Sequence, residues 1–109
     1  MGNRQQTRKL ARARTREVQL KINAAREAIG EGDMVAAERE CQSAIGIDPL
    51  AASPYHLLAH IAYSQGRLKN AGDNILEAAT RDDKDLEIHS DCGAIMNTLG
   101  RGAEAEAAC

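Results

Sequence analysis

The chain has 109 residues and a formal net charge of −2, with 20 alanines and two tyrosines but neither tryptophan nor phenylalanine. This length permits a single domain, and a core without large aromatic side chains requires elements that approach one another closely. An all-β domain is excluded, because strong helix formers are abundant whereas valine occurs only at Val18 and Val35. We therefore expect an all-α fold in which helices pack on helices.

The sequence contains no apolar run of the roughly 20 residues that cross a bilayer and no apolar stretch typical of a secretory signal. We therefore expect no membrane span and a cytoplasmic location. The three cysteines, Cys41, Cys92 and Cys109, are an odd number without a C-x-x-C pair. This pattern predicts neither a disulfide framework nor a zinc site, and we interpret the cysteines as small apolar residues.

Residues 1–17 are predicted to form a basic arm or helix extension. Six of the 14 basic residues lie in the first 16 positions, which contain no acid, so the remainder of the chain carries a net charge of −8. Arg4, Arg8, Arg12 and Arg16 recur every four residues and would share one side of a helix. A solvated extension is the favoured interpretation. Binding to nucleic acid or lipid is disfavoured, because the arm has no aromatic residue and little apolar area, and pairing with the acidic body of a second copy is a third alternative.

The rest of the chain has a 34-residue internal period. Three glycines mark it: Gly32, Gly66 and Gly100. Small residues recur at fixed distances from these glycines. Seven positions before them stand Ala25, Ala59 and Gly93; five positions after them stand Ala37, Ala71 and Ala105; and twelve positions after the first two stand Ala44 and Ala78. Small side chains at fixed positions allow helix axes to approach closely, and a repeated glycine suits the left-handed residue that ends a helix. The period therefore predicts pairs of helices joined at the glycines.

The segment from Gly32 to Pro49, GDMVAAERECQSAIGIDP, resembles the second helix and closing Asp-Pro of the tetratricopeptide repeat family. That family has two antiparallel helices in each 34-residue unit. The resemblance places repeats at 18–51 and 52–85 and an incomplete repeat at 86–109, which together form the repeat domain 18–109. It implies helical hairpins stacked as a right-handed superhelix, an α-solenoid.

Local signals within these repeats predict how the helices begin and end. Asp33 is expected to cap the second helix of the first repeat, and Ser53 followed by proline is expected to cap the next helix. Asp48-Pro49 is expected to stop the helix before it. The bulky aromatic that the family carries early in the first helix is Tyr55 in the middle repeat. Lys21 and His89 stand there in the outer repeats, which we therefore expect to pack more loosely.

In the resembling proteins, the first helix of each pair lines a concave groove that binds a peptide. Ser53, His56, His60 and Tyr63 are spaced three, four and three residues apart and share one helix face. The candidate binding residues are Ile22, Asn23, Arg26, Ser53, His56, His60, Tyr63, Ser90 and Asn97. Asn23 and Arg26 match parts of the family's clamp for a C-terminal carboxylate, but the later repeats depart from that clamp.

His56 and His60, four residues apart, also suit a metal ion, with Asp91 or His89 as third ligand. No third ligand is fixed by the spacing, so we predict no metal site; a pH-sensitive groove is an alternative use of two nearby imidazoles. The sequence contains no G-x-S-x-G, H-E-x-x-H or phosphate-loop motif. We accordingly expect no catalytic residues, no enzymatic activity and no cofactor.

These observations favour a non-catalytic scaffold or adaptor that binds a peptide or protein segment. One alternative is the N-terminal targeting module of a larger bacterial glycosyl-, sulfo- or methyltransferase, by analogy with similar arrays. Another is binding of an anionic polymer by the basic arm. Only nine residues follow Gly100 and they provide no polar capping helix, which indicates either a fragment or a homo-oligomer formed through this end.

Overall fold

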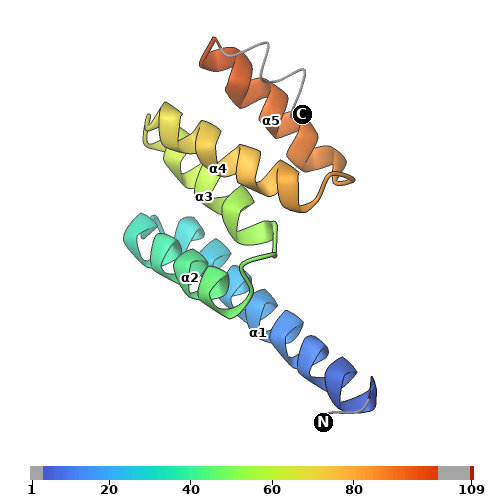
Figure 1. Ribbon diagram of the computed structural model, residues 1–109. Coiled ribbons are helices and arrows are strands. Elements are labelled where there is room, and N and C mark those ends of the chain that lie inside the picture. Colours follow the sequence, from blue (N-terminus) through green and yellow to red (C-terminus); the bar gives the residue numbers. More distant parts are fainter. Residues whose placement is uncertain (1–3, 101–108) are drawn as a thin grey trace. The chain divides into compact units, whose positions relative to one another are not determined.

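The computed structural model describes residues 4–100 and Cys109. This part of the chain is helical without strands, which confirms the all-α prediction. The helices, shown in Figure 1, are α1 (Arg4–Gly30), α2 (Met34–Ile47), α3 (Ser53–Ser64), α4 (Leu68–Arg81) and α5 (Leu86–Thr98). None of these helices has an apolar stretch long enough to cross a membrane.

The chain divides into two compact units, Met1–Pro49 and Leu50–Cys109. The first contains α1 and α2, and the second contains α3, α4 and α5. This division lies close to the predicted boundary between the first two repeats. It does not lie at the end of the basic arm, which is continuous with α1 and belongs to the first unit.

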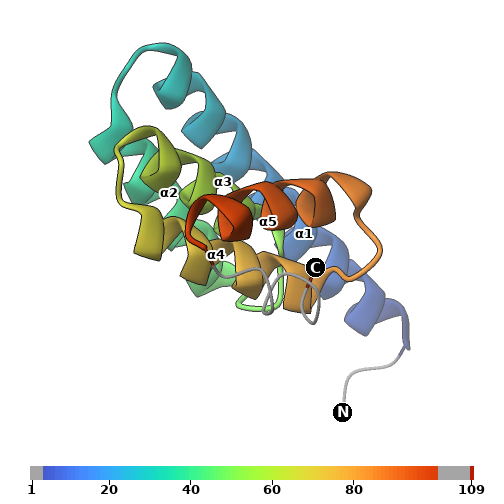
Figure 2. The same cartoon turned by 90° about the horizontal axis from the view of Figure 1, so that it is seen from above.

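In the first unit, α1 and α2 lie side by side as a hairpin (Figures 1 and 2). Their buried residues are Val18, Ile22, Ala25, Ala28, Ala37, Cys41 and Ala44. Most of these side chains are small, so the helices approach closely, as the repeated alanines predicted. Lys21 occupies the position of Tyr55 in the second unit and pairs with Glu40 of α2 at 3.6 Å. A hollow of about 410 Å³ opens beside this pair.

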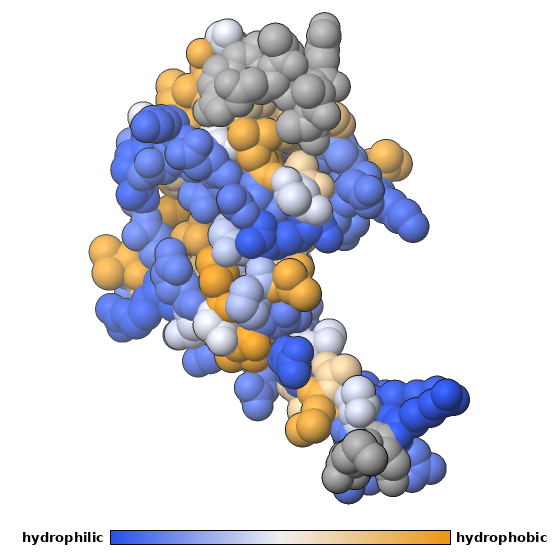
Figure 3. Space-filling model, in the orientation of Figure 1, coloured by the Kyte–Doolittle hydropathy of each residue, from blue (hydrophilic) through white to orange (hydrophobic). Residues whose placement is uncertain are grey.

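The basic arm is a helical extension of α1. Every residue from Arg4 to Glu17 is exposed, and Val18 is the first buried residue of the helix. The 14 exposed residues span about 21 Å at 1.5 Å per residue. In Figure 3 this end of α1 is strongly hydrophilic, as its arginines require. From Arg4 onward the arm is therefore a helical extension of α1.

In the second unit, α4 packs against both α3 and α5. The core is Ala59, Ala62, Ala71, Ile75, Ala78, Ala79, Ile88, Cys92, Ile95 and Met96. Tyr55 of α3 packs against this core, and the Arg81 guanidinium of α4 lies 4.1 Å from the centre of its ring. Arg81 also forms an ion pair with Glu77. The Arg81–Tyr55 contact joins α4 to α3, whereas the Arg81–Glu77 ion pair lies within α4.

The glycines of the 34-residue period have the predicted left-handed backbone. Their φ angles are +79° at Gly32, +75° at Gly66 and +73° at Gly100. After α1, the Asp33 N–H donates to the Ala28 carbonyl at 2.9 Å; after α3, the Arg67 N–H donates to the Ala62 carbonyl at the same distance. These bonds are typical of a helix that ends in a left-handed residue. The two hairpins therefore turn in the same way, one full period apart.

Two of the predicted helix boundaries are confirmed and one is wrong. The Asp33 side chain accepts a hydrogen bond from the Ala36 N–H at 3.0 Å and caps α2, which ends before Asp48-Pro49. Ser53 is not a cap. The backbone is already helical at Ala52, with φ −77° and ψ −34°, so Ser53 lacks the extended geometry that a capping side chain needs.

The cysteine prediction is also wrong, because Cys92 and Cys109 form a disulfide with their Cα atoms 5.7 Å apart. They are separated by 17 residues and carry no local motif, so only tertiary folding brings them together. Cys41 is a free, buried thiol. Burial, reinforced by Glu38 and Glu40, raises its pKa to about 11. The remainder of the incomplete third repeat, 101–108, lies outside the described residues, as does the end predicted to form a homo-oligomer.

Candidate functional site

Helix α3 presents the predicted row of polar residues on one face. Ser53, His60 and Tyr63 are exposed and His56 is half-buried. Apolar residues of α3 on its other side, Leu58, Ala59, Ile61 and Ala62, are buried. The amphipathic pattern of the helix therefore turns the two histidines and Tyr63 away from the core.

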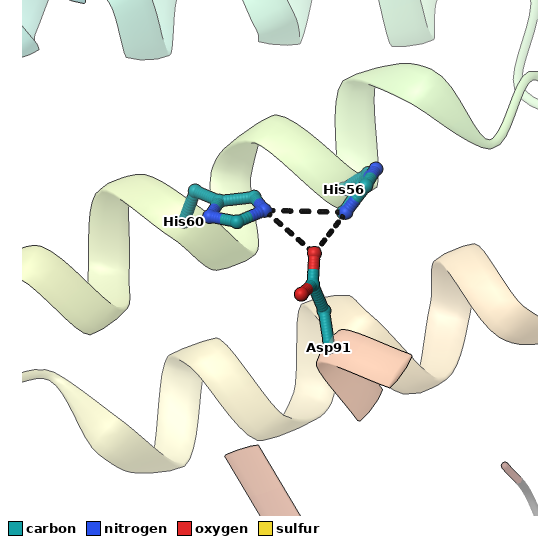
Figure 4. Close-up of side chains that lie close together, drawn as sticks. All are labelled: His56, His60 and Asp91. Atoms are coloured by element: carbon teal, nitrogen blue, oxygen red, sulfur yellow. Dashed lines mark hydrogen bonds and ion pairs between the residues drawn. The ribbon is translucent and has the colours of Figure 1, made fainter. Parts of the chain in front are cut away.

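Helix α5 brings a carboxylate to this face. Its first turn is capped by Asp85, whose side chain accepts from the N–H groups of Glu87 at 2.9 Å and Ile88 at 3.2 Å. The helix then buries Ile88, Cys92, Ile95 and Met96. Asp91 lies beside this apolar stripe, so its side chain leaves the core at the edge that faces α3 (Figure 4).

His56, His60 and Asp91 form a compact group, called here the histidine–aspartate cluster (Figure 4). The Asp91 Oδ2 atom lies 2.7 Å from Nε2 of His56 and 2.9 Å from Nε2 of His60. The two Nε2 atoms are 3.2 Å apart. Exposure of the side chains increases from 15% for His56 and 28% for Asp91 to 50% for His60, so the cluster is anchored on one side and open on the other.

The cluster changes the acidity of its carboxyl group. Burial raises the pKa of Asp91, but the hydrogen bonds from His56 and His60, with the positive charge that these imidazoles can carry, outweigh burial. The pKa of Asp91 is therefore held below its ordinary value of 3.8. Asp91 is accordingly an anion at neutral pH, in contact with two imidazole nitrogens.

A hollow of about 180 Å³ adjoins the cluster, and we call it the α3–α5 hollow. It is lined by His60, Tyr63, Asp91, Ala94 and Ile95. The histidine and aspartate supply polar groups, while the alanine and isoleucine supply apolar surface. Tyr63, 45% exposed, contributes an aromatic ring with a hydroxyl group.

The structure brings together only some of the predicted binding residues. His56 and His60 meet in the cluster, and His60 and Tyr63 share the α3–α5 hollow. Ser53, Ser90 and Asn97 are exposed on α3 and α5 but do not line the hollow.

The remaining predicted residues lie on α1, in the first unit. Asn23 and Arg26 are exposed, and Asn23 accepts a hydrogen bond from the Gln19 side chain at 2.9 Å. Ile22 is only 1% exposed, so the prediction that it is a binding residue is wrong. Ile22 is buried because its aliphatic side chain lies on the inner face of α1, and burial of apolar surface lowers the free energy of the fold.

Sequence reasoning leaves Asp91, Ala94 and Ile95 out of the binding set, and it offers Asp91 only as one of two alternative third ligands beside His89. The structure separates these two: the His89 ring contacts the Asp83 carbonyl, whereas Asp91 contacts both other histidines. The sequence does contain a signal for this pairing. Asp91 lies 35 positions after His56, one more than the 34-residue period, so the two residues occupy nearly equivalent positions in the pattern.

Comparisons of the chain with models of protein families, with curated proteins and with solved structures find no match. The α3–α5 face can hydrogen-bond to a polar group, hold a cation beside an anionic carboxylate, and enclose one apolar side chain.

Proposed function

We propose that the chain is a non-catalytic protein-interaction module, built of hairpins like those of the tetratricopeptide repeat family, that acts as a scaffold or adaptor. In this proposal a segment of a partner protein binds along α3 and α5 of the second unit. The observation that carries the proposal is the α3–α5 hollow, where polar and apolar groups from two helices converge on exposed surface.

The repeated geometry of the hairpins supports this class of protein. Helices α2 and α4 begin one full period apart, at Met34 and Leu68, and also end one full period apart, at Ile47 and Arg81. Arrays of such repeats use their first helices to bind extended or helical protein segments. In the predicted repeats 52–85 and 86–109, α3 and α5 would be the first helices.

The size of the hollow favours a protein segment over a small molecule. Pockets for small ligands measure roughly 300–1,000 Å³. The α3–α5 hollow, at about 180 Å³, suits a single side chain of a longer segment. Tyr63 at its rim has the large, half-exposed aromatic surface that often dominates binding between proteins.

The test is site-specific photo-cross-linking in the native cell. A photoreactive phenylalanine derivative replaces Tyr63 at the hollow or, as a control, Lys69 on the exposed face of α4. We expect position 63 to cross-link one contiguous segment of a partner and position 69 to give only background. Equal yields at the two positions, or no adduct at position 63, would contradict the proposal.

A pair of tryptophan substitutions on α5 sharpens the test. Ala94→Trp places a bulky ring in the hollow, whereas Thr98→Trp places the same ring one turn further along, on an exposed residue outside the lining. Ala94→Trp should remove the cross-link from position 63, and Thr98→Trp should retain it. Circular dichroism checks that both variants remain helical.

A further inference from the structure

The histidine–aspartate cluster contains a contact that hydrogen bonds alone do not satisfy. Three atoms, Nε2 of His56, Nε2 of His60 and Oδ2 of Asp91, form a triangle with sides of 2.7, 2.9 and 3.2 Å. Each of these atoms carries lone pairs or, on nitrogen, a single proton. The number of protons available at the centre therefore decides how many sides can be hydrogen bonds.

No distribution of protons makes all three sides favourable. If both nitrogens are protonated, both donate to the carboxylate, and the two donor nitrogens then lie 3.2 Å apart with no hydrogen bond between them. If one nitrogen is unprotonated, it can accept from the other, but its lone pair then lies within 2.9 Å of the carboxylate oxygen. A cation at the centre of the triangle attracts all three atoms at once.

The dimensions of the triangle suit a small transition-metal ion. Bonds from zinc to imidazole nitrogen and carboxylate oxygen are about 2.0–2.2 Å, so tetrahedral ligand atoms lie about 3.3 Å apart. The atoms of the cluster need to separate by about 0.6 Å at most. Two imidazoles with one carboxylate also match the ligand types that zinc accepts.

We propose that His56, His60 and Asp91 bind a divalent transition-metal ion, Zn²⁺ being the best match, with three protein ligands and an open fourth position. His60 and Asp91 also line the α3–α5 hollow, so the open position borders that hollow and is accessible to water or to another ligand. This proposal goes beyond protein binding and does not depend on it.

The repeat itself does not require ligands at these positions. One period away from His56 stand Ile22 and Ser90, and one period away from His60 stand Arg26 and Ala94. The hairpins therefore fold with aliphatic, small or cationic side chains in the same places. The cluster is a feature of the second unit alone, which favours a specific role over a general role in packing.

Two of the three proposed ligands are fixed in position before any ion binds. His56 and Asp91 are largely covered, at 15% and 28% exposed, and they come from different helices fixed by the same core. His60, 50% exposed, is on the open side and gives the ion a route of entry. A site of this kind loses little conformational freedom on binding.

The test consists of two titrations of the oxidised full chain. Calorimetry measures the binding of ZnCl₂, and visible absorption measures the binding of CoCl₂. We expect one ion per chain and an absorption band typical of four-coordinate Co²⁺. Asp91→Asn preserves the shape of the side chain and removes its charge, and His60→Ala removes an open-side ligand. Each should weaken binding by more than about 100-fold, since even contacts outside the ligand set are worth roughly 10–100-fold.

The third histidine provides the matched control. His89→Gln removes an imidazole that is outside the cluster, and it should leave Zn²⁺ affinity and stoichiometry unchanged. Absence of binding by the unaltered chain at millimolar ion, or equal affinity in His60→Ala, would overturn the proposal. If Asp91→Asn loses helical circular dichroism, histidine NMR decides instead: Zn²⁺ must shift the ring signals of His56 and His60 and leave those of His89 in place.

Discussion

The glycines of the first unit allow a matched pair of substitutions with opposite outcomes. Gly32 lies in the turn between α1 and α2 with φ +79°, and Gly46 lies in the last turn of α2. Both are exposed, and a Cβ atom added at either would meet no atom within 4 Å apart from its chain neighbours and, at Gly46, the backbone of its own helix. Replacing each by alanine therefore changes backbone energetics without changing packing.

The expected magnitudes follow from backbone conformation alone. An L-residue in the left-handed region costs roughly 1–2 kcal/mol, so Gly32→Ala should lower the free energy of unfolding by about that amount. Alanine is more stable than glycine in a helix by roughly 0.5–1 kcal/mol. Gly46→Ala should therefore raise the free energy of unfolding by about 0.5 kcal/mol, the lower value because helix ends fray.

Urea unfolding, monitored by circular dichroism, measures both effects, and both substitutions lie in the first unit of the chain. For a slope in the lower part of the range of roughly 1–3 kcal/mol per M, Gly32→Ala should lower the midpoint by about 1 M, and Gly46→Ala should raise it slightly. A neutral or stabilising Gly32→Ala would refute the assignment of this glycine to a required left-handed turn, and with it the structural basis of the 34-residue period.

Three further predictions concern the cysteines, a helix cap and the cluster. The native chain should react with no thiol reagent at pH 8, because Cys41 is buried with a pKa of about 11 and the other cysteines are paired; in denaturant one thiol per chain should react. Asp85→Ala should destabilise α5 by about 1 kcal/mol, measured by urea unfolding against Asp85→Asn, which retains a capping oxygen. Because the folded-state pKa of Asp91 is lowered, its carboxylate stabilises the fold above pH 3.8 and this contribution is lost as the pH falls through the folded pKa. The difference in unfolding free energy between the unaltered chain and Asp91→Asn should accordingly shrink as the pH falls below 3.8 and vanish in strong acid; a difference that persists unchanged at pH 2 would contradict the lowered pKa.

The parts of the fold that local sequence determines were predictable. A left-handed turn requires glycine at one position, and a close helix crossing requires a small residue such as alanine at another. The recurrence of glycine at Gly32, Gly66 and Gly100 therefore located the turns. Asp33 was recognisable as a cap because it follows such a glycine directly. Ser53 is misleading, because whether a residue is the cap or the first helical residue depends on one pair of backbone angles at Ala52.

The candidate site depended on tertiary structure to a greater extent. The spacing of His56 and His60 placed both on one face of α3, but their third partner comes from α5. Asp91 and His89 are two residues apart, and only the rotation of α5 about its apolar stripe decides which of them faces α3. The disulfide between Cys92 and Cys109 was unpredictable for the same reason, since no local pattern links the two residues.

The most direct measurement of the central claim is hydrogen–deuterium exchange of the chain alone and in the complex isolated with its partner. If the α3–α5 face of the second unit binds a protein segment, amide protection should increase in peptides covering α3 and α5 and remain unchanged in α2. Protection confined to residues 4–17 would contradict the account, because it would assign the contact to the basic arm instead of the hollow.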